Sequence, residues 1–327
     1  MNSEQRTLNS GSRQALRLGA ILLVLLVAVL IAAAMLGAER LPLTGLTEQQ
    51  RSILFDIRIP RILLGACVGA SLAVAGAGLQ ALLRNPLAEP YLLGVSNGAA
   101  LGTMIGFVAF QNIEAARPVL AFAGAVAATV VVYRMAKSRA GMSVERLVLS
   151  GVIVTTFLSS VIVMLTTVLD ATRLRSFTFW LLGDLSQASS TGIWISGVTV
   201  AIVTVILTSQ ARSLNLMMIG ERDALDFGVE VGRVRLLVFG GASLVVGAAV
   251  AASGSVGYVG LIVPHLVRLS VGSDNRLVVP FSAVAGAIFV VLADTIARTV
   301  IAPRELPVGA VTALVGAPLF IYLLRRS

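Results

Sequence analysis

The chain has 327 residues, of which 57% are hydrophobic and 13% charged, and its mean hydropathy is +0.93. Soluble domains do not have this composition, so the sequence predicts an all-α membrane protein that crosses the bilayer several times. The formal net charge of +9 is a topogenic signal, because Lys and Arg gather in cytoplasmic loops. The arginines are scattered between apolar runs instead of lining one face, so we expect no nucleic-acid partner.

Ten apolar runs predict ten transmembrane helices within a single domain, 1–327. The first follows a polar segment, 1–17, and at about twenty residues it is long for a secretory signal, so we expect a retained span. The predicted spans are residues 18–38, 61–82, 91–110, 118–133, 147–168, 192–209, 236–253, 256–271, 278–296 and 307–324.

An even number of spans places both termini on the same side of the membrane. In this arrangement sixteen of the 25 Lys and Arg residues lie on the side of the termini and nine on the other. The bias predicts cytoplasmic termini and a cytoplasmic (inner) membrane location.

Two arginines flank Pro60 at the end of the predicted outer loop, 39–60. Proline favours the first turn of a helix, so Arg58 and Arg61 are predicted at a helix N-terminus, where the macrodipole disfavours cations. Either Asp56 and the lipid headgroups neutralise them, or an acidic partner docks on them from outside. Both interpretations stay open on the residues alone.

The apolar run after Arg61 carries small residues on one helical face. Gly65, Gly69, Ala73 and Gly76 share this face, with Gln80 one turn further on. Small residues at this spacing let two helix backbones approach closely, which drives helix association in lipid. The second span is therefore predicted to pack tightly.

Two polar stretches interrupt the later spans. The first, 170–190, has an apolar core too short to cross the membrane, so we expect a short helix at the outer surface. The second, 210–235, is expected on the cytoplasmic side as helical segments between glycines. Its apolar residues predict a partner surface; they are Leu214, Leu216, Met217, Met218, Leu225 and Phe227.

The last third of the chain holds the remaining polar residues of the spans. Pro264 predicts a short, broken eighth span, and His265 beside it is expected to be structural rather than a base or ligand. Asp294 is the most deeply embedded acid, and Arg298 four residues later predicts a local ion pair rather than a proton pathway.

Residue types that carry catalysis or bind metals are scarce. Cys67 is the single cysteine, which excludes an intrachain disulfide and a cysteine-based metal site. The single lysine, Lys137, does not lie in a GxxxxGK[ST] sequence, so the chain has no P-loop. We therefore expect neither an enzyme nor a resident metal or cofactor.

A faint internal repeat favours two inverted-like halves. Gly69-Ala-Ser-Leu72 recurs as Gly241-Ala-Ser-Leu244, in spans that are predicted to run in opposite directions. Chance remains an equal explanation in a chain this rich in Ala, Gly and Leu.

Four motifs carry a resemblance to a known family. They read Arg58-Ile-Pro-Arg61, Gln80-Ala-Leu-Leu-Arg84-Asn-Pro-Leu-Ala88, Gly257-Tyr-Val-Gly-Leu-Ile-Val-Pro-His265 and Glu305-Leu-Pro-Val-Gly309. From about residue 50 to its end, the chain resembles the FecCD-type permeases, the membrane subunits of ABC importers for iron chelates and cobalamin.

The resemblance implies a homodimer with the pathway on its two-fold axis, two copies of a separate ATPase that uses ATP and Mg, and a periplasmic binding protein that delivers substrate. Arginines at the positions of Arg58, Arg61 and Arg298 meet glutamates of that binding protein in relatives. The 210–235 stretch would form the coupling helices, with Gly220, Ala224 and Gly228 in their core.

The resemblance also places the fifth span and the short helix after it along the pathway. Gln80, Arg173 and Arg175 are candidate pathway residues, although the two latter arginines are equally compatible with lipid headgroups. Haem, a ferric siderophore and cobalamin all remain open as substrate. The alternative class is an ion-coupled secondary transporter, which would need buried acids and no coupling loop.

Overall fold

The computed structural model describes residues 3–37, 42, 45–110, 113, 115–138 and 141–326. They form helices, apart from a short antiparallel hairpin of β1 (Lys137–Ser138) and β2 (Gly141–Met142). The helices are α1 (Ser3–Met35), α2 (Glu48–Ser52), η1 (Ile53–Arg58), α3 (Ile59–Leu83), η2 (Pro90–Leu93), α4 (Val95–Ala109), α5 (Ala116–Ala136), α6 (Val144–Thr166), α7 (Ala171–Leu181), α8 (Ser190–Ser209), α9 (Ala211–Ile219), α10 (Glu221–Asp226), α11 (Val231–Ser253), α12 (Val259–Val271), α13 (Asn275–Thr299) and α14 (Val308–Arg326).

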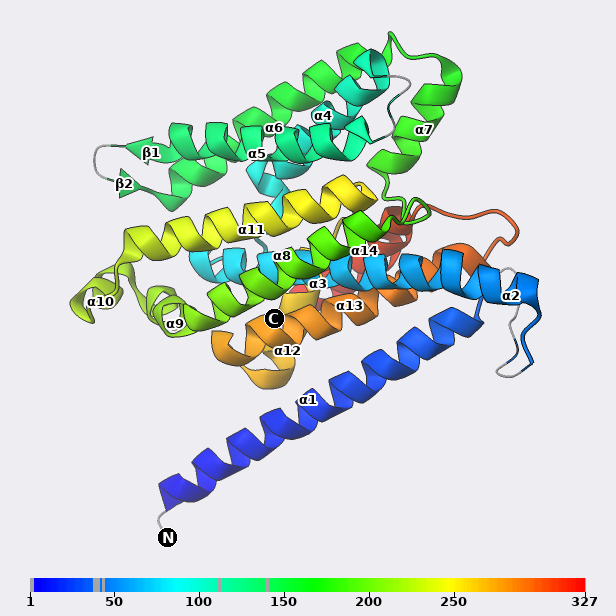
Figure 1. Ribbon diagram of the computed structural model, residues 1–327. Coiled ribbons are helices and arrows are strands. Elements are labelled where there is room, and N and C mark those ends of the chain that lie inside the picture. The colour runs from blue at the N-terminus through cyan, green and yellow to red at the C-terminus, as the bar shows by residue number, and fades with distance from the viewer. Residues whose placement is uncertain are drawn as a thin grey trace.

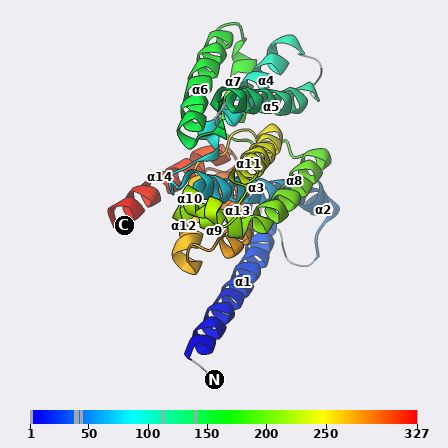
Figure 2. The same ribbon diagram turned by 90° about the vertical axis from the view of Figure 1, so that its left-hand side faces the viewer.

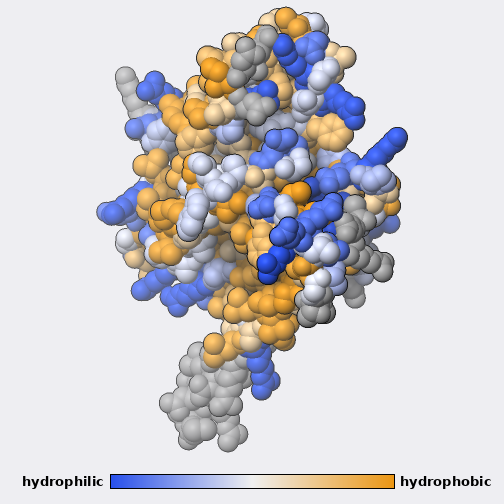
Figure 3. Space-filling model, turned by 45° about the vertical axis from the view of Figure 1, so that its right-hand side comes forward, coloured by the Kyte–Doolittle hydropathy of each residue, from blue (hydrophilic) through white to orange (hydrophobic). Residues whose placement is uncertain are grey.

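The all-α membrane fold predicted from composition is confirmed. Among the described residues, seven helical segments are long and apolar enough to cross a membrane, and α4, α12 and α14 contribute three shorter apolar helices. Each of the ten predicted spans therefore corresponds to a helix. Figure 3 shows apolar side chains exposed over much of one flank, as expected for a surface that faces lipid.

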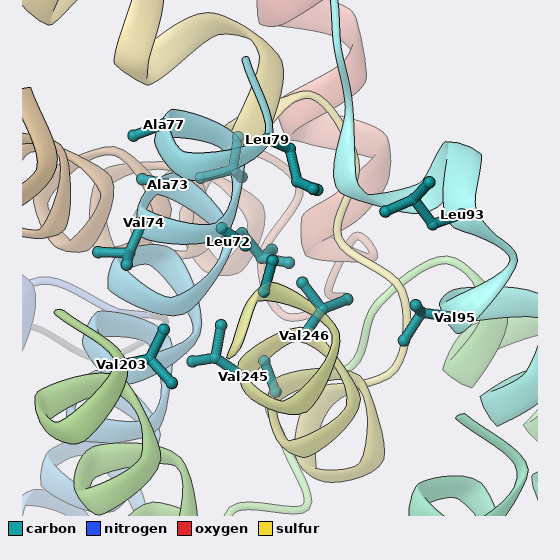
Figure 4. Packing of buried hydrophobic residues seen from close by; sticks show 14 of the residues in the cluster. Leu72, Ala73, Val74, Ala77, Leu79, Leu93, Val95, Val203, Val245 and Val246 are labelled. Carbon is teal, nitrogen blue, oxygen red and sulfur yellow. The ribbon is translucent and has the colours of Figure 1, made fainter. Parts of the chain in front are cut away.

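The helices form two groups around α3. In Figures 1 and 2, α4–α7 lie together above α11, while α3, α8, α12 and α13 lie below it and α1 runs along the outside. Helix α3 packs against α8, α11, α12 and α13. Figure 4 shows side chains of α3, α8 and α11 converging in this core; they include Leu72, Val203, Val245 and Val246.

The small-residue face of α3 is confirmed as its close-packing surface. A Cβ on Gly69 would lie 2.1 Å from the Gly286 carbonyl oxygen of α13, and a Cβ on Gly76 would lie 1.9 Å from the Gly260 oxygen of α12. Glycine is needed at both positions because the obstructing atom is backbone, which cannot turn away.

The short elements between the long helices gather at two opposite ends of the bundle (Figure 1). Helices α9 and α10, the β1–β2 hairpin and the start of α1 lie at the left in Figure 1, and α2 and α7 lie at the right. We call these the α9–α10 end and the α2–α7 end. The repeated Gly-Ala-Ser-Leu motifs lie on α3 and α11, which pack together and run in opposite directions (Figure 1); the inverted repeat itself stays a prediction.

The N-terminus of the second span differs from the prediction. The helix continues unbroken from Glu48 to Leu83, so Arg58 and Arg61 lie inside a helix, not at its start. The π-helical turn η1 explains how Pro60 is tolerated, since Ile59 N–H bonds the carbonyl of Leu54 in a wider ring that makes room for a residue without N–H.

The two polar stretches contain the short helices that were predicted. Asp170 caps α7 by accepting a hydrogen bond from the backbone of Arg173. Within 210–235, α9 and α10 are separated by Gly220. The eighth span is short, as predicted, but α12 is continuous through Pro264, so the predicted break is wrong.

Candidate functional sites

A cluster of charged side chains lies at the α2–α7 end. Arg61 contacts two carboxylates: its Nε lies 3.0 Å from Asp294 Oδ1 and its Nη1 lies 2.7 Å from Glu305 Oε2. Arg298 Nε lies 3.0 Å from Asp294 Oδ2, so the predicted local ion pair is confirmed. Asp294 is thus held between two arginines. Asp56 accepts a hydrogen bond from the Ser52 hydroxyl.

This cluster is buried except at one member. Arg58, Arg61, Asp294 and Arg298 are each almost fully buried, whereas the Glu305 side chain is 48% exposed. Buried charges are stable only when paired and hydrogen-bonded, and Asp294 supplies that partner to both arginines. The charged group that this cluster exposes at the surface is therefore the Glu305 carboxylate.

Two of the arginines also cap the first helix. Arg58 Nη1 donates to the carbonyl oxygens of Ala34 (2.9 Å) and Met35 (3.1 Å), and Arg298 Nη2 donates to that of Ala33 (3.2 Å). The last carbonyls of a helix have no intrahelical partner, and the macrodipole favours cations there. The docking role of Arg58, Arg61 and Arg298 stays a prediction beside these structural contacts.

The α9–α10 end holds the residues predicted for coupling. Gly220 is the extended residue between α9 and α10, Ala224 is fully buried, and Gly228 has a φ of +76°, which favours glycine. Arg235 of α11 pairs with Glu221 of α10. These contacts fix α10 against the end of the bundle.

The apolar residues predicted to contact a partner differ in exposure. Leu225 and Phe227 are exposed, as is Ile219, which sequence reasoning did not include; Ile219 and Phe227 reach 75% and 73%. In contrast, Leu214 and Met217 are buried in the main core, because α9 lies along the bundle and turns its apolar face inward.

Gln80 lies in the protein interior rather than along an open path. Its Nε2 donates to the carbonyl oxygens of Gly260 (3.2 Å) and Leu261 (3.1 Å) at the start of α12. Pro264 has no N–H, so the Gly260 carbonyl lacks its usual helical partner. The contact accounts for Gln80 as a structural residue in this conformation, and its pathway role stays a prediction.

Arg173 and Arg175 lie on α7, at the end opposite α9 and α10. Arg173 Nε is 3.1 Å from Asp170 Oδ2, and the Arg175 guanidinium lies 5.8 Å from the centroid of the Phe179 ring. Both contacts lie within α7 and its cap, and the pathway role of the two arginines stays a prediction.

A pocket of about 430 Å³, with a mainly apolar surface and several polar groups, lies between η2, α4 and α6. Its lining consists of Glu89, Tyr91, Leu92, Ser96, Asn97, Val152, Thr155, Thr156 and Ser255. Helix α6 is the span that the resemblance placed along the pathway, but the individual polar residues were missed. Glu89 and Asn97 were visible beside the Arg84-Asn-Pro-Leu-Ala88 motif, yet nothing in the spacing showed that they meet α6.

Glu89 lines the pocket and also contacts the residue that precedes α12. It lies between α3 and η2, outside the membrane-spanning helices. Its Oε1 accepts a hydrogen bond from the Tyr258 backbone N–H at 3.0 Å. Burial raises the pKa of the Glu89 carboxyl, and the Tyr258 hydrogen bond opposes that rise in part. Within the described part of the chain, no three His, Cys, Asp or Glu side chains come together as a metal site.

Comparisons with known proteins agree with this architecture. The model of the FecCD transport family matches residues 20–326. The cobalamin import permease BtuC of Halobacterium salinarum is 43% identical over 86% of this chain and 75% of its own, and the hemin transport permease HmuU of Yersinia pestis is 36% identical over 94% of each. A solved metal-chelate type ABC transporter in an inward-facing conformation superimposes with a TM-score of 0.86, at 32% identity over 94% of this chain and 98% of its own.

Proposed function

Because this chain belongs to the FecCD transport family, we propose that it is the membrane-spanning permease subunit of an ABC importer that carries a metal chelate into the cytoplasm. The observation that carries the proposal is the likeness to a metal-chelate transporter along nearly the whole helix bundle. The relatives named above are transport permeases, which favours a transport subunit over an enzyme.

The proposed partners follow from what the chain lacks and what it exposes. It has no P-loop, so a separate ATPase would bind ATP and Mg. Ile219, Leu225 and Phe227 offer that ATPase an apolar contact at the α9–α10 end. This end would face the cytoplasm together with both termini, in the inner membrane of the cell, and two permeases would pair with two ATPases.

The opposite end would receive a binding protein loaded with substrate. Arg58, Arg61 and Arg298 are buried there and Glu305 covers Arg61, so acidic side chains of a partner would reach the arginines when Glu305 moves aside. ATP drives transport only if it binds one conformation better than the other, so closure of the ATPases must move α9 and α10. The pocket beside α6 needs no high affinity for substrate, because substrate has to leave it.

The substrate class is a metal chelate. Relatives are named for cobalamin and hemin, and others for Fe(3+)-citrate and iron(3+)-hydroxamate import. Arg173 and Arg175 would favour a chelate with carboxylates, such as haem or a carboxylate siderophore.

An ion-coupled secondary transporter is the alternative, and Asp294 is the residue it would need. Asp294 is a buried acid, but Arg61 and Arg298 both contact its carboxylate. Asp294 is therefore already the counter-ion of two buried arginines, which is a structural role rather than that of a free carrier group. The exposed apolar side chains of α10 also have no role in such a transporter.

The test is reconstitution in liposomes with a candidate ATPase and candidate binding proteins loaded with haem, a ferric siderophore or cobalamin. We expect one binding protein to stimulate hydrolysis and to deliver its substrate inside. Uptake driven by an ion gradient without any ATPase would contradict the proposal. Ala224→Trp, which overfills a buried site, should uncouple hydrolysis from uptake, whereas Gly232→Ala, which meets no atom within 4 Å, serves as the control.

A further inference from the structure

The guanidinium of Arg61 has one buried side and one side near the surface. Its Nε and Nη2 face Asp294, which is only 3% exposed at its side chain, while its Nη1 faces Glu305. Glu305 lies in the segment that joins α13 to α14, and its neighbour Leu306 donates a backbone hydrogen bond to Ala297. The backbone of this segment is therefore anchored, and the Glu305 side chain covers Arg61.

The two ion pairs of Arg61 differ in how easily they can be exchanged. Removing the buried Asp294 would leave an uncompensated charge, which is strongly unfavourable. In the pair with Glu305 the arginine is buried but the carboxylate is 48% exposed, so Glu305 can turn into water while Arg61 keeps Asp294 as its partner. Another carboxylate can thus take the place of Glu305 at little cost, using the same Nη1 donor.

The charge balance of the cluster favours such an exchange. Arg61 and Arg298 carry two positive charges, and their partners Asp294 and Glu305 carry two negative charges. When Glu305 turns away, Arg61 and Arg298 share the single charge of Asp294, so one positive charge is left uncompensated near the surface. An incoming carboxylate restores the pairing that Glu305 gave up.

We propose that Glu305 is an internal substitute for a carboxylate of the docking partner, and that docking exchanges one carboxylate for the other on Arg61. This inference rests on the proposed function, because it requires an acidic binding protein at the α2–α7 end. The exchange also implies that Glu305 lowers the affinity of the permease for its docking partner. The exchange keeps Arg61 paired both before and after the partner binds.

Affinity measurements with Glu305 variants test the exchange. The full-length permease in nanodiscs is titrated with the binding protein that stimulates hydrolysis in the reconstitution, and the variants are Glu305→Gln, Arg61→Gln and Glu48→Gln. Glu48 is an exposed acid of α2 at the same end, so Glu48→Gln reproduces the change in net charge without touching the cluster. We expect Glu305→Gln alone to bind about two- to fivefold more tightly.

The outcomes separate this inference from the proposed function. If Glu305→Gln binds like Glu48→Gln while Arg61→Gln binds more weakly, docking on the arginines stands and the exchange is wrong. If none of the variants changes the affinity, the partner does not dock on this cluster. The proposed docking role of the arginines and the exchange are then both wrong.

The salt dependence of docking tests the exchange even if Arg61→Gln does not fold. An exchange breaks one ion pair for each one formed, so docking to the unmodified permease should depend weakly on salt. Glu305→Gln forms the new pair without breaking one, so its docking should depend more steeply on ionic strength. Equal salt dependence of the two proteins would overturn the exchange.

Discussion

The side-chain amide of Gln80 donates to the carbonyl of Gly260, the group that Pro264 leaves without a partner in its own helix. Backbone groups inside a bilayer have no water to bond, so a proline in a spanning helix requires a donor from a neighbour. Gly76 and Gly260 allow α3 and α12 to approach closely enough for Gln80 to supply it. A proline and a glutamine far apart in sequence thus form one structural unit.

The first prediction concerns this unit. Gln80→Leu keeps the approximate size of the side chain and removes the donor, so we expect a loss of about 0.6–2 kcal/mol in unfolding free energy. The loss should shrink in a Pro264→Ala background, because alanine restores an N–H to the Gly260 carbonyl. Unfolding of the four proteins in detergent completes a double-mutant cycle. An equal loss in both backgrounds would show that Gln80 does not serve the carbonyl freed by Pro264.

The sequence was most informative about elements that depend on local composition. The ten spans follow from apolar length, and the small-residue face of α3 follows from helical spacing; both were predicted correctly. Helix α2 was missed although Thr47 and Gln50 form a capping box, because the polar stretch around them was read as a loop.

Pairings between distant residues could not be predicted from one sequence. Arg61 meets Asp294 and Glu305 only because α3 and α13 pack together, and no local spacing encodes that contact. The same holds for Glu89 and Tyr258, which meet through the packing of η2 against α12. Arg58 and Arg61 were predicted at a helix N-terminus, and that position is wrong. Both nevertheless belong to the charged cluster at the α2–α7 end.

The second prediction concerns the closest helix contact. Gly69→Ala would place a Cβ 2.1 Å from the Gly286 carbonyl oxygen, so α3 and α13 must separate and we expect a loss of about 1–3 kcal/mol or failure to fold. Gly240→Ala of α11 is the matched control, because no atom lies within 4 Å of its added Cβ. Alanine there should be neutral or stabilising by up to about 1 kcal/mol. Thermal unfolding in detergent compares the two, and equal stability would contradict the packing.

The third prediction compares the two carboxylates of the charged cluster. Asp294→Asn leaves Arg61 and Arg298 buried without a negative partner between them, so we expect a loss of about 3–5 kcal/mol. Glu305→Gln should change stability by less than about 1 kcal/mol, because Glu305 is half exposed. Purified yield and thermal unfolding of both variants are the measurements. A tolerated Asp294→Asn would mean that the arginines find other partners.

The fourth prediction uses the raised pKa of Glu89. The folded protein holds the Glu89 proton more tightly than the unfolded chain does, so this group favours folding below its ordinary pKa and loses that contribution as pH rises through the folded value. Glu89→Gln keeps an oxygen that accepts from Tyr258 N–H and never ionises. We therefore expect the variant to be more stable than the unmodified protein at pH 7 and the difference to fade toward about pH 4. A difference that is constant with pH, or a less stable variant at pH 7, would contradict this account.

The fifth prediction concerns the link between α9 and α13. Asn215 Oδ1 accepts from both the backbone N–H (3.0 Å) and the side-chain Nδ2 (2.7 Å) of fully buried Asn275, while Asn215 Nδ2 donates to Asp274, the N-cap of α13. If movement of α9 reaches α13 through these bonds, Asn275→Ala should lower the substrate transported per ATP hydrolysed more than it lowers hydrolysis itself.

A purely structural role for Asn275 predicts a different result. It would reduce the amount of folded permease and therefore lower uptake and hydrolysis together, leaving their ratio unchanged. Ser270→Ala changes an exposed residue in the last turn of α12, so it controls for losses during purification and reconstitution. The effects of Asn215→Ala and Asn275→Ala on the ratio should also be non-additive, because each variant breaks the same bonds. Additive effects would place the coupling path elsewhere in the contact between α9 and the bundle.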